Sequence, residues 1–470
     1  MEELRLDDSI NLLNRLSTIV GASEAAIRLL VSILIGYPIC LAHRHYLYGK
    51  TAEVQHVFFF FCGFILGYFN FGLDVFHSFV TVCLVYCVLK VIPGTISSVI
   101  IILVFTMTYL LIGYHKTSSE TYEINWTMPQ CVLTLRLTGL AIDLYDGKQP
   151  VESLSVTSKK LALTEVPSLL EVYAHVYFPG SFLVGPQFPM RRYKDYIATK
   201  FSNPGTLPDC LNAAGTCLGL GLIYLVIFQV GYIYFNDNYL LSPEFEAKCL
   251  ISRLFFMGIW GHVALYKYVC IWKICEGVCV TSGITHNGVG PDGNAKWDGC
   301  KNIDIKTFEG ATNFGHYVES FNINTNQWVL QYIYKRLKFL GNKYLSQIGV
   351  LLFLALWHGF NSGYYMCFFM EFVCLVMEKD LTSILNKNMD ALEFLNRSGA
   401  KQLTWVILKL YTLVFMGYCM APFVLLSIHK WFRVYMSVFF IGHVLWMGWL
   451  GYKPLVIKLL PPKEGHPKSR

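Results

Sequence analysis

CLNAAGTCLGLGLIYLVIFQVGYIYFN is the sequence of residues 210–236, a run of 27 residues that contains no Asp, Glu, Lys or Arg. A helix needs about 20 apolar residues to cross a hydrocarbon core of ~30 Å. Lipid offers the backbone no hydrogen-bond partners, so a spanning segment satisfies its own peptide groups as a helix. This stretch therefore predicts a membrane-spanning helix.

Five further uncharged runs of similar length predict more spans. They lie between residues 53 and 74, 90 and 116, 343 and 371, 409 and 430, and 433 and 453. Shorter or interrupted candidates are 25–47, 74–92, 128–146 and 250–280. We expect an all-α polytopic membrane protein with about 10 to 11 transmembrane helices, joined by short interfacial and re-entrant helices.

The composition of the chain supports the same class. The chain has 470 residues, of which 54% are hydrophobic and 15% are charged, whereas soluble domains carry about 25% charged residues. The formal charge of +7 is spread along the chain, so nucleic acid is excluded as a partner. The 15 cysteines form no C-x-x-C pair, so the sequence supports neither a zinc site nor a redox motif.

We expect one membrane-embedded domain over residues 1–470. Its parts are an N-terminal segment at 1–22, an interfacial segment at 281–345, a helix at 344–370 and a basic tail at 461–470. Residues 147–210 contain seven prolines around an apolar patch at 178–188. Because prolines break helices, this stretch is predicted to be re-entrant or interfacial.

His358 lies inside the uncharged run, 15 residues after Lys343 and 13 before Glu371. At 1.5 Å per residue, either end is roughly 20 Å away. An ionisable group at that depth is costly, which makes it a candidate functional residue. A neutral imidazole accepts a proton at cellular pH, as a general base must. The alternative is a core histidine hydrogen-bonded to a neighbouring helix.

The segment SFNINTNQWV at 320–329 carries three asparagines, Asn322, Asn324 and Asn326. In a helix, Asn322 and Asn326 would share one face. An amide can hold a base or a reacting carbonyl in place. The alternative is a helix cap or a turn, both of which favour asparagine.

Basic residues follow this segment, at Lys335, Arg336, Lys338 and Lys343. By the positive-inside rule they mark a cytosolic end of the run that holds His358. They either anchor the chain at the membrane surface or bind the phosphates of a soluble anionic substrate. The pair Trp297–Asp298, which follows Lys296, is a weaker candidate of the same kind.

Several of these segments resemble one known family. WHGFNSGYYMCF at 357–368 resembles the W-H-G-x-x-P-G-Y-x-x-x-F signature of membrane-bound O-acyltransferases that act on lysophospholipids. YCMAPF at 418–423 resembles a second signature, Y-x-x-x-x-F, and Trp297–Asp298 a third. The resemblance extends over nearly the whole chain, including PSLLEV at 167–172, LVGPQF at 183–188, SFNINTN at 320–326 and KRLKFLGNK at 335–343.

The resemblance implies an enzyme with a central catalytic tunnel in the endoplasmic reticulum membrane. Such enzymes move a polyunsaturated acyl chain from acyl-coenzyme A to the sn-2 hydroxyl of lysophosphatidylcholine, and also of lysophosphatidylethanolamine and lysophosphatidylserine. Acyl-coenzyme A is a substrate, so no cofactor is implied. The chain lacks a C-terminal K-K-x-x retrieval signal.

The family roles carry over to particular residues. The catalytic base would be His358, and the catalytic asparagine would be Asn322 rather than Asn324 or Asn326. Residues expected to contact acyl-coenzyme A or the lysolipid are Lys335, Arg336, Lys338, Trp297, Asp298, Tyr364 and Tyr418. Ser362 stands where many relatives have proline.

A second class of function stays open from the residues alone. A polytopic transporter or channel could use His358 as a proton relay. Transporters more often show inverted repeats and paired broken helices, and neither is evident in the sequence. Homodimer formation is also left open.

Overall fold

The computed structural model describes residues 13–19, 21–117, 123–202 and 207–462. Within these ranges the regular structure is helical, and pairing between extended segments is limited to isolated bridges such as Ile303 with Phe321. The predicted all-α class is therefore confirmed. Most of the segment at 1–22 and of the tail at 461–470 lies outside the described residues.

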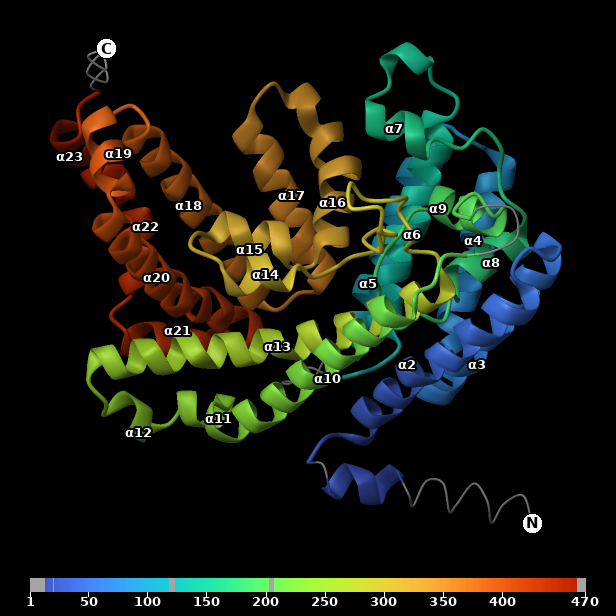
Figure 1. Cartoon of the computed structure of the whole chain (residues 1–470), viewed down its shortest axis with the longest axis horizontal. Coiled ribbons are helices and arrows are strands. Elements are labelled where there is room, and N and C mark those ends of the chain that lie inside the picture. Colours follow the sequence, from blue (N-terminus) through green and yellow to red (C-terminus); the bar gives the residue numbers. More distant parts are fainter. Residues whose placement is uncertain (1–12, 20, 118–122, 203–206, 463–470) are drawn as a thin grey trace. The chain divides into compact units, whose positions relative to one another are not determined.

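The helices gather into two compact units (Figure 1). Unit 1 comprises Met1–Tyr224, Val269–Asn302 and Asn324–Phe339, and unit 2 comprises Leu225–Tyr268, Ile303–Ile323 and Leu340–Arg470. Two long helices contribute residues to both units: α10 (Leu211–Tyr234) and α13 (Leu250–Ser282).

Unit 1 is built mainly from the N-terminal half of the chain. Its helices are α2 (Glu24–Ala42), α3 (Ala52–Phe71), α4 (Val75–Val91), α5 (Ile96–Lys116), α6 (Thr127–Asp146), α7 (Val156–Leu161), α8 (Leu169–Val176), α9 (Met190–Ile197) and α16 (Ile323–Tyr332). Short π and 3-10 turns are His43–Leu47, Gly72–Asp74, Val151–Ser153 and Tyr334–Leu340. The closest helix pairs are α5 with α6 and α3 with α8.

Arg136 organises the proline-rich segment of unit 1. Its guanidinium, which is 2% exposed, donates to the carbonyls of His175 and Val176 at 2.8 and 2.7 Å and to Ser181 Oγ at 2.6 Å. These bonds provide the partners that a buried charge needs. The apolar patch at 178–188 is buried around this arginine, so it is not a free loop.

Unit 2 holds most of the C-terminal half. Its helices are α11 (Asp237–Leu240), α12 (Pro243–Glu246), α14 (Ile305–Glu309), α15 (Phe314–Ser320), α17 (Lys343–His358), α18 (Ser362–Leu385), α19 (Met389–Asn396), α20 (Ser398–Leu425), α21 (Ile428–Ser437), α22 (Ile441–Met447) and α23 (Trp449–Leu459). Helix α18 is central, because it packs on α17, α20, α15 and α22.

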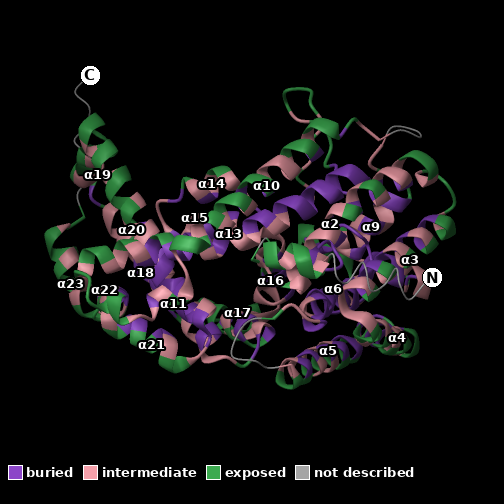
Figure 2. Cartoon of the chain, turned by 90° about the horizontal axis from the view of Figure 1, so that it is seen from below, coloured by how far each residue is buried: buried purple, intermediate pink, exposed green. Residues whose placement is uncertain are grey.

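Six helical segments of the described chain are long and apolar enough to cross a membrane. They are Glu24–Leu47, Ala52–Val91, Ile96–Lys116, Leu211–Leu240, Leu250–Ser282 and Ser398–Leu425. Helices such as α4 and α5 expose part of their apolar surface, visible in green in Figure 2, as expected where lipid is the solvent. The chain is a multi-pass membrane protein, and the expected total of about 10 to 11 spans stays a prediction.

The interrupted candidate at 250–280 is confirmed as one apolar helix of 33 residues, α13, and its Lys273 and Glu276 form a buried ion pair. Two other predicted spans are broken in the structure. The span at 433–453 falls on three short helices, α21, α22 and α23. The predicted helix at 344–370 is two helices, α17 and α18, which are separated after His358. Short helices occupy the segment at 281–345, as expected.

Candidate active site

The break after His358 places this residue at the C-terminus of α17. Gly359 has φ 127°, a conformation that residues with a Cβ rarely adopt. Its N–H bonds to the carbonyls of Ala355 and Leu356 at 3.1 Å each. The helix therefore ends at the histidine, and the short link 359–361 leads into α18.

The hydrogen bond of the His358 ring fixes which nitrogen carries the proton. Nδ1 lies 2.7 Å from the carbonyl oxygen of Leu354. A carbonyl can only accept, so Nδ1 is the donor, and the neutral ring keeps its lone pair on Nε2. Among the described residues, the Leu354 carbonyl is the one group bonded to this ring. Nε2 is thus able to accept a proton from a ligand.

Four aromatic side chains surround the imidazole. Ring centroids lie 4.7 Å away for Trp357, 5.5 Å for Tyr364, and 5.3 Å for both Phe368 and Phe423. They come from α17, α18 and α20. Aromatic residues from two separate signatures, the one that contains His358 and the Y-x-x-x-x-F signature, therefore lie around the same imidazole. They make the immediate surroundings of the half-buried ring largely apolar, and polar interactions are stronger where water is excluded.

The start of α18 is fixed against the end of α20. Gly363 N–H donates to the carbonyl of Leu426 at 3.1 Å, and an added Cβ on Gly363 would lie 1.9 Å from the Pro422 carbonyl oxygen. Only glycine permits this approach. The Ser362 hydroxyl donates to the Leu426 carbonyl at 3.3 Å and accepts from Trp431 Nε1 at 3.2 Å. These contacts hold Phe423 and Tyr364 next to His358.

Tyr364 and Tyr418 have different surroundings. Tyr364 belongs to the aromatic surround of His358, as its signature position predicts. Tyr418 is fully buried, stacks on Tyr435 with centroids 4.4 Å apart, and is hydrogen-bonded to His443 Nδ1. Its contacts within the described chain are to these residues of α21 and α22 and to their neighbours, so its observed role is packing.

Asn322 lies directly before α16 rather than within it. Its φ of 52° is in the left-handed region, which asparagine tolerates better than most residues. The prediction that Asn322 and Asn326 share a helix face is therefore wrong, because the helix begins at Ile323. The preceding residue, Phe321, stacks on Phe308 with centroids 5.7 Å apart. This packing anchors the Asn322 backbone in unit 2.

Asn324 has a structural role. Its side-chain amide donates to the carbonyls of Cys300 and Lys301 at 3.2 and 3.0 Å, and its N–H donates to Asn302 Oδ1 at 3.0 Å. These bonds tie the first turn of α16 to the preceding loop. Asn324 therefore fastens α16 to the loop at 300–302, whereas Asn322 precedes the helix.

The basic residues after α16 also differ from one another. Arg336 forms a bidentate ion pair with Asp146, at 2.8 and 2.5 Å, and Asp146 is 1% exposed. Lys335 donates to Gln331 Oε1 at 2.6 Å. Lys338 is exposed. Of the three residues predicted to bind acyl-coenzyme A, Lys338 is the one that stands out toward solvent.

Trp297 and Asp298 belong to a loop that is held by contacts among its own residues. The Trp297 ring meets the His286 ring edge-on at 5.2 Å, and Asp298 Oδ1 accepts from Asn287 Nδ2 at 2.9 Å. Burial lowers the pKa of His286, so this contact joins two uncharged rings. These bonds account for both residues as parts of a loop in unit 1.

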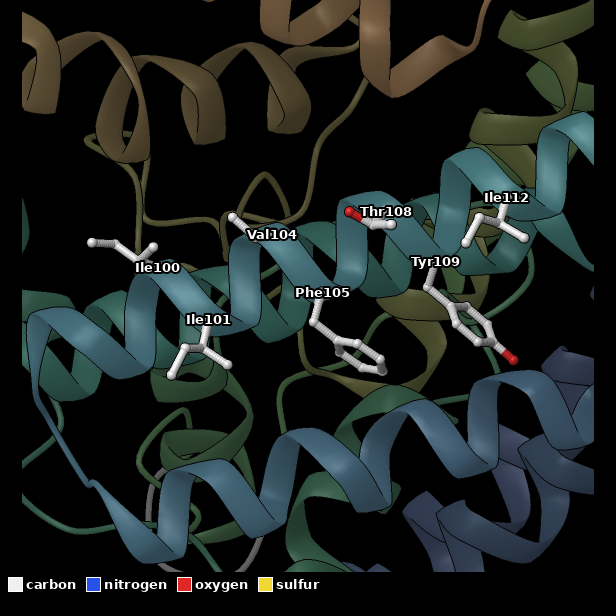
Figure 3. A pocket seen from close by; sticks show the side chains of 7 residues that line it. All are labelled: Ile100, Ile101, Val104, Phe105, Thr108, Tyr109 and Ile112. Atoms are coloured by element: carbon white, nitrogen blue, oxygen red, sulfur yellow. The ribbon is translucent and has the colours of Figure 1, made fainter.

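An open apolar groove of ≈ 500 Å³ lies on α5 of unit 1, and none of its lining residues is among those discussed above. Figure 3 shows seven side chains that line it, all from α5. Its polar groups are the hydroxyls of Thr108 and Tyr109, and the latter is bonded to His77 of α4 at 2.7 Å. The groove is a lipid-type surface without a candidate nucleophile, acid or base.

The sequence singled out Ser362 only as a departure from the proline of many relatives, and no role was predicted for Trp431 or for the two phenylalanines beside His358. Phe368 and Phe423 are signature positions, so the motifs could have indicated them. Trp431 had no local signal, because its role follows from a bond to Ser362, which is 69 residues away in the sequence.

Comparison with known proteins gives a consistent result. A model of the membrane-bound O-acyltransferase family matches residues 111–440. Lysophospholipid acyltransferase 5 of Rattus norvegicus is 43% identical over 459 residues, which cover 97% of this chain and 94% of the relative. The proteins of the same name are 42% identical over 96% and 93% in Homo sapiens, and 41% identical over 94% and 89% in Drosophila melanogaster.

Proposed function

The chain belongs to the membrane-bound O-acyltransferase family, and from that premise we propose that it transfers an acyl chain from acyl-coenzyme A to the sn-2 hydroxyl of a lysophospholipid. The relatives are named for lysophospholipid acyltransfer. The observation that carries the proposal is the His358 ring, whose Nδ1 is bound to the Leu354 carbonyl and whose Nε2 is an available acceptor.

The proposed reaction is a direct transfer without an acyl-enzyme. Nε2 of His358 takes the proton of the sn-2 hydroxyl while that oxygen attacks the thioester carbonyl carbon. The carbon–sulfur bond then breaks, and coenzyme A leaves as a thiolate that receives the proton from Nε2. The new ester and free coenzyme A are the products, and the histidine is neutral again. Well-placed base catalysis of this kind contributes about 10²–10⁴ in rate.

We assign Asn322 to the thioester carbonyl. An amide N–H donor stabilises the negative charge that develops on the carbonyl oxygen, and such a donor is worth about 10²–10³ in rate. The assignment is supported by the position of Asn322 in the family motif and by the different, structural role of Asn324.

The acyl chains of both substrates partition into the membrane, whereas coenzyme A is soluble and highly charged. We place its phosphates near the exposed basic residues Lys338 and Lys343. Lys343 begins α17 and His358 ends it, so the helix spans roughly 20 Å between a basic end and the proposed base. A tunnel along this helix would bring the thioester to the histidine.

Finer points of the proposal follow from the family resemblance. They are residence in the endoplasmic reticulum, polyunsaturated acyl chains, and acceptance of lysophosphatidylcholine, lysophosphatidylethanolamine and lysophosphatidylserine. The proposal also includes a homodimer. The molecular mass of the purified protein in detergent would show whether it forms.

The test uses the purified full-length protein. Incubation with acyl-coenzyme A and lysophosphatidylcholine should produce phosphatidylcholine and free coenzyme A in equal amounts, measured by mass spectrometry. No product, together with a proton flux in sealed vesicles that depends on His358, would instead support a transporter with a relay histidine.

A further inference from the structure

Glu371 is an ionisable side chain of unit 2 that the proposed mechanism does not use. It lies in the middle of α18, seven residues after Tyr364 and three after Phe368. Residues with these spacings share one face of a helix. Glu371 therefore continues the face of α18 that contacts His358 through Tyr364 and Phe368, about 10 Å along the axis from Tyr364.

The carboxylate of Glu371 has no protein partner in the described part of unit 2: no hydrogen bond or ion pair reaches it. Glu371 interacts electrostatically with the thiols of Cys367, Cys374 and Cys419. A thiol carries no positive charge, so none of them is a counter-ion for the carboxylate. Glu371 is half-buried, so part of its surface is open to a ligand.

Two lysines of unit 2, one on α20, which packs on α18, and one paired with a residue of α18, have other partners. Lys409 of α20 donates to the carbonyls of Glu309 and Ala311, and Lys453 of α23 pairs with Asp380. The other acidic residue on this face, Glu378, also has a partner, because both its oxygens accept from the Phe314 N–H at 3.1 and 3.0 Å. Glu371 is therefore the acidic residue on this face of α18 that has no partner within the described part of unit 2.

A lone carboxylate among apolar and aromatic side chains is costly, and such groups usually serve a ligand. We propose that Glu371 binds the cationic ammonium group of the lysophospholipid headgroup while the sn-2 hydroxyl is held at His358. This inference rests on the proposed function. The aromatic rings of Tyr364 and Phe368 on the same face add cation–π attraction for an ammonium group.

The geometry fits a lysolipid because its ammonium and its sn-2 hydroxyl are joined by a short phosphodiester arm. Glu371 and the aromatic side chains around His358 are one to two helical turns apart on α18, which is about 5–10 Å. Acyl-coenzyme A carries no quaternary ammonium and would not compete for this carboxylate. The inferred site therefore sets preference among lysolipids and does not take part in the chemical step.

The test compares two acceptors with the same acyl chain. Lysophosphatidylcholine has a cationic headgroup, and lysophosphatidylglycerol has the phosphate without the cation. In Glu371→Gln, the KM for lysophosphatidylcholine should rise about tenfold, as expected for the loss of one charged contact. The KM for acyl-coenzyme A, and the KM or inhibition constant for lysophosphatidylglycerol, should stay within about twofold of wild type, well under a tenfold change.

Glu378→Gln is the matched control, because it is the same change on the same face of the same helix. It should lower the unfolding temperature, since Phe314 N–H loses a charged acceptor, and it should leave the preference between the two lysolipids unchanged. Glu371→Asp keeps the charge but shortens the side chain, so its KM for lysophosphatidylcholine should lie between wild type and Glu371→Gln. It also serves as the test if Glu371→Gln does not fold.

The outcomes are distinguishable. A wild-type protein that acylates no lysolipid contradicts the proposed function. An active wild type, with Glu371 variants that are folded and show an unaltered preference between the two lysolipids, overturns the inference about Glu371 alone.

Discussion

Two histidines in aromatic surroundings, His43 in unit 1 and His358 in unit 2, show why burial alone does not identify a base. His43 is fully buried and lies 4.2 Å from the Phe59 ring. Both its nitrogens are engaged by the protein, with Gln55 Oε1 at 3.1 Å and the Tyr196 hydroxyl at 3.1 Å. At His358 the protein engages Nδ1 only.

The two histidines differ in how many of their ring nitrogens are hydrogen-bonded by the protein. A ring with both nitrogens occupied acts as a cross-link between helices and costs little to bury. A ring with one unoccupied nitrogen is held in a single orientation and still offers a proton acceptor. The same contrast separates Arg336, which is paired with Asp146, from the exposed Lys338.

The largest effect is expected for His358→Ala. Removing the proposed base should lower the turnover of acyl transfer by about 10²–10⁴, and should lower the unfolding temperature only through the loss of one hydrogen bond and of the ring's contacts with its aromatic neighbours. Product formation by mass spectrometry and a thermal melt in detergent would measure both. A folded variant with near wild-type turnover would remove the distinction between the two histidines.

Asn322→Ala should lower turnover by about 10²–10³, as expected for the loss of an oxyanion donor. The matched control is Asn324→Ala, which loses the side-chain bonds to the loop at 300–302. It should reduce the unfolding temperature more than the turnover per folded molecule. If the two variants exchange these effects, the catalytic asparagine is Asn324.

The reverse pattern is expected for His43→Ala. Its loss removes a partner of Gln55 Oε1 and one of the two partners of the Tyr196 hydroxyl in a buried site, which costs about 1–3 kcal/mol of stability. The unfolding temperature should fall, while turnover per folded molecule should stay close to wild type. A large loss of turnover at unchanged stability would assign catalysis to unit 1 as well.

The smallest effect concerns acyl-coenzyme A. Lys338→Ala should raise the KM for acyl-coenzyme A by roughly two- to fivefold, and added salt should weaken the difference, because exposed charges are screened. Arg336→Ala should mainly lower stability, since Asp146 would be left buried without its partner. An increase in KM for Arg336→Ala alone, at unchanged stability, would instead place the phosphates at Arg336.

The sequence was informative where a local property decides the outcome. Uncharged runs located α10 and the apolar part of α20, and the depth of His358 in its run singled it out. The break after His358 was not predicted, because it depends on Gly359 adopting φ 127° and on Gly363 meeting Pro422. Hydropathy does not report such backbone contacts.

Contacts between residues that are far apart in the sequence could not be predicted either. Asp146 and Arg336 are 190 residues apart in the sequence, so nothing local marked this arginine as an ion-pair partner rather than a phosphate ligand. Tyr418 and Phe423 belong to one signature, yet only Phe423 contacts the His358 ring. Which of two motif residues faces a site depends on the orientation of α20, and packing decides that orientation.

One distance decides whether His358 is the base: the distance from its Nε2 to the sn-2 hydroxyl oxygen, measured in an experimental structure of the protein with lysophosphatidylcholine and a non-reactive thioether analogue of acyl-coenzyme A. We expect the two atoms to lie within hydrogen-bond distance, about 2.6–3.2 Å, with the thioether next to them. A structure in which Nε2 faces lipid tails, or in which the hydroxyl is held by another side chain, would contradict this expectation.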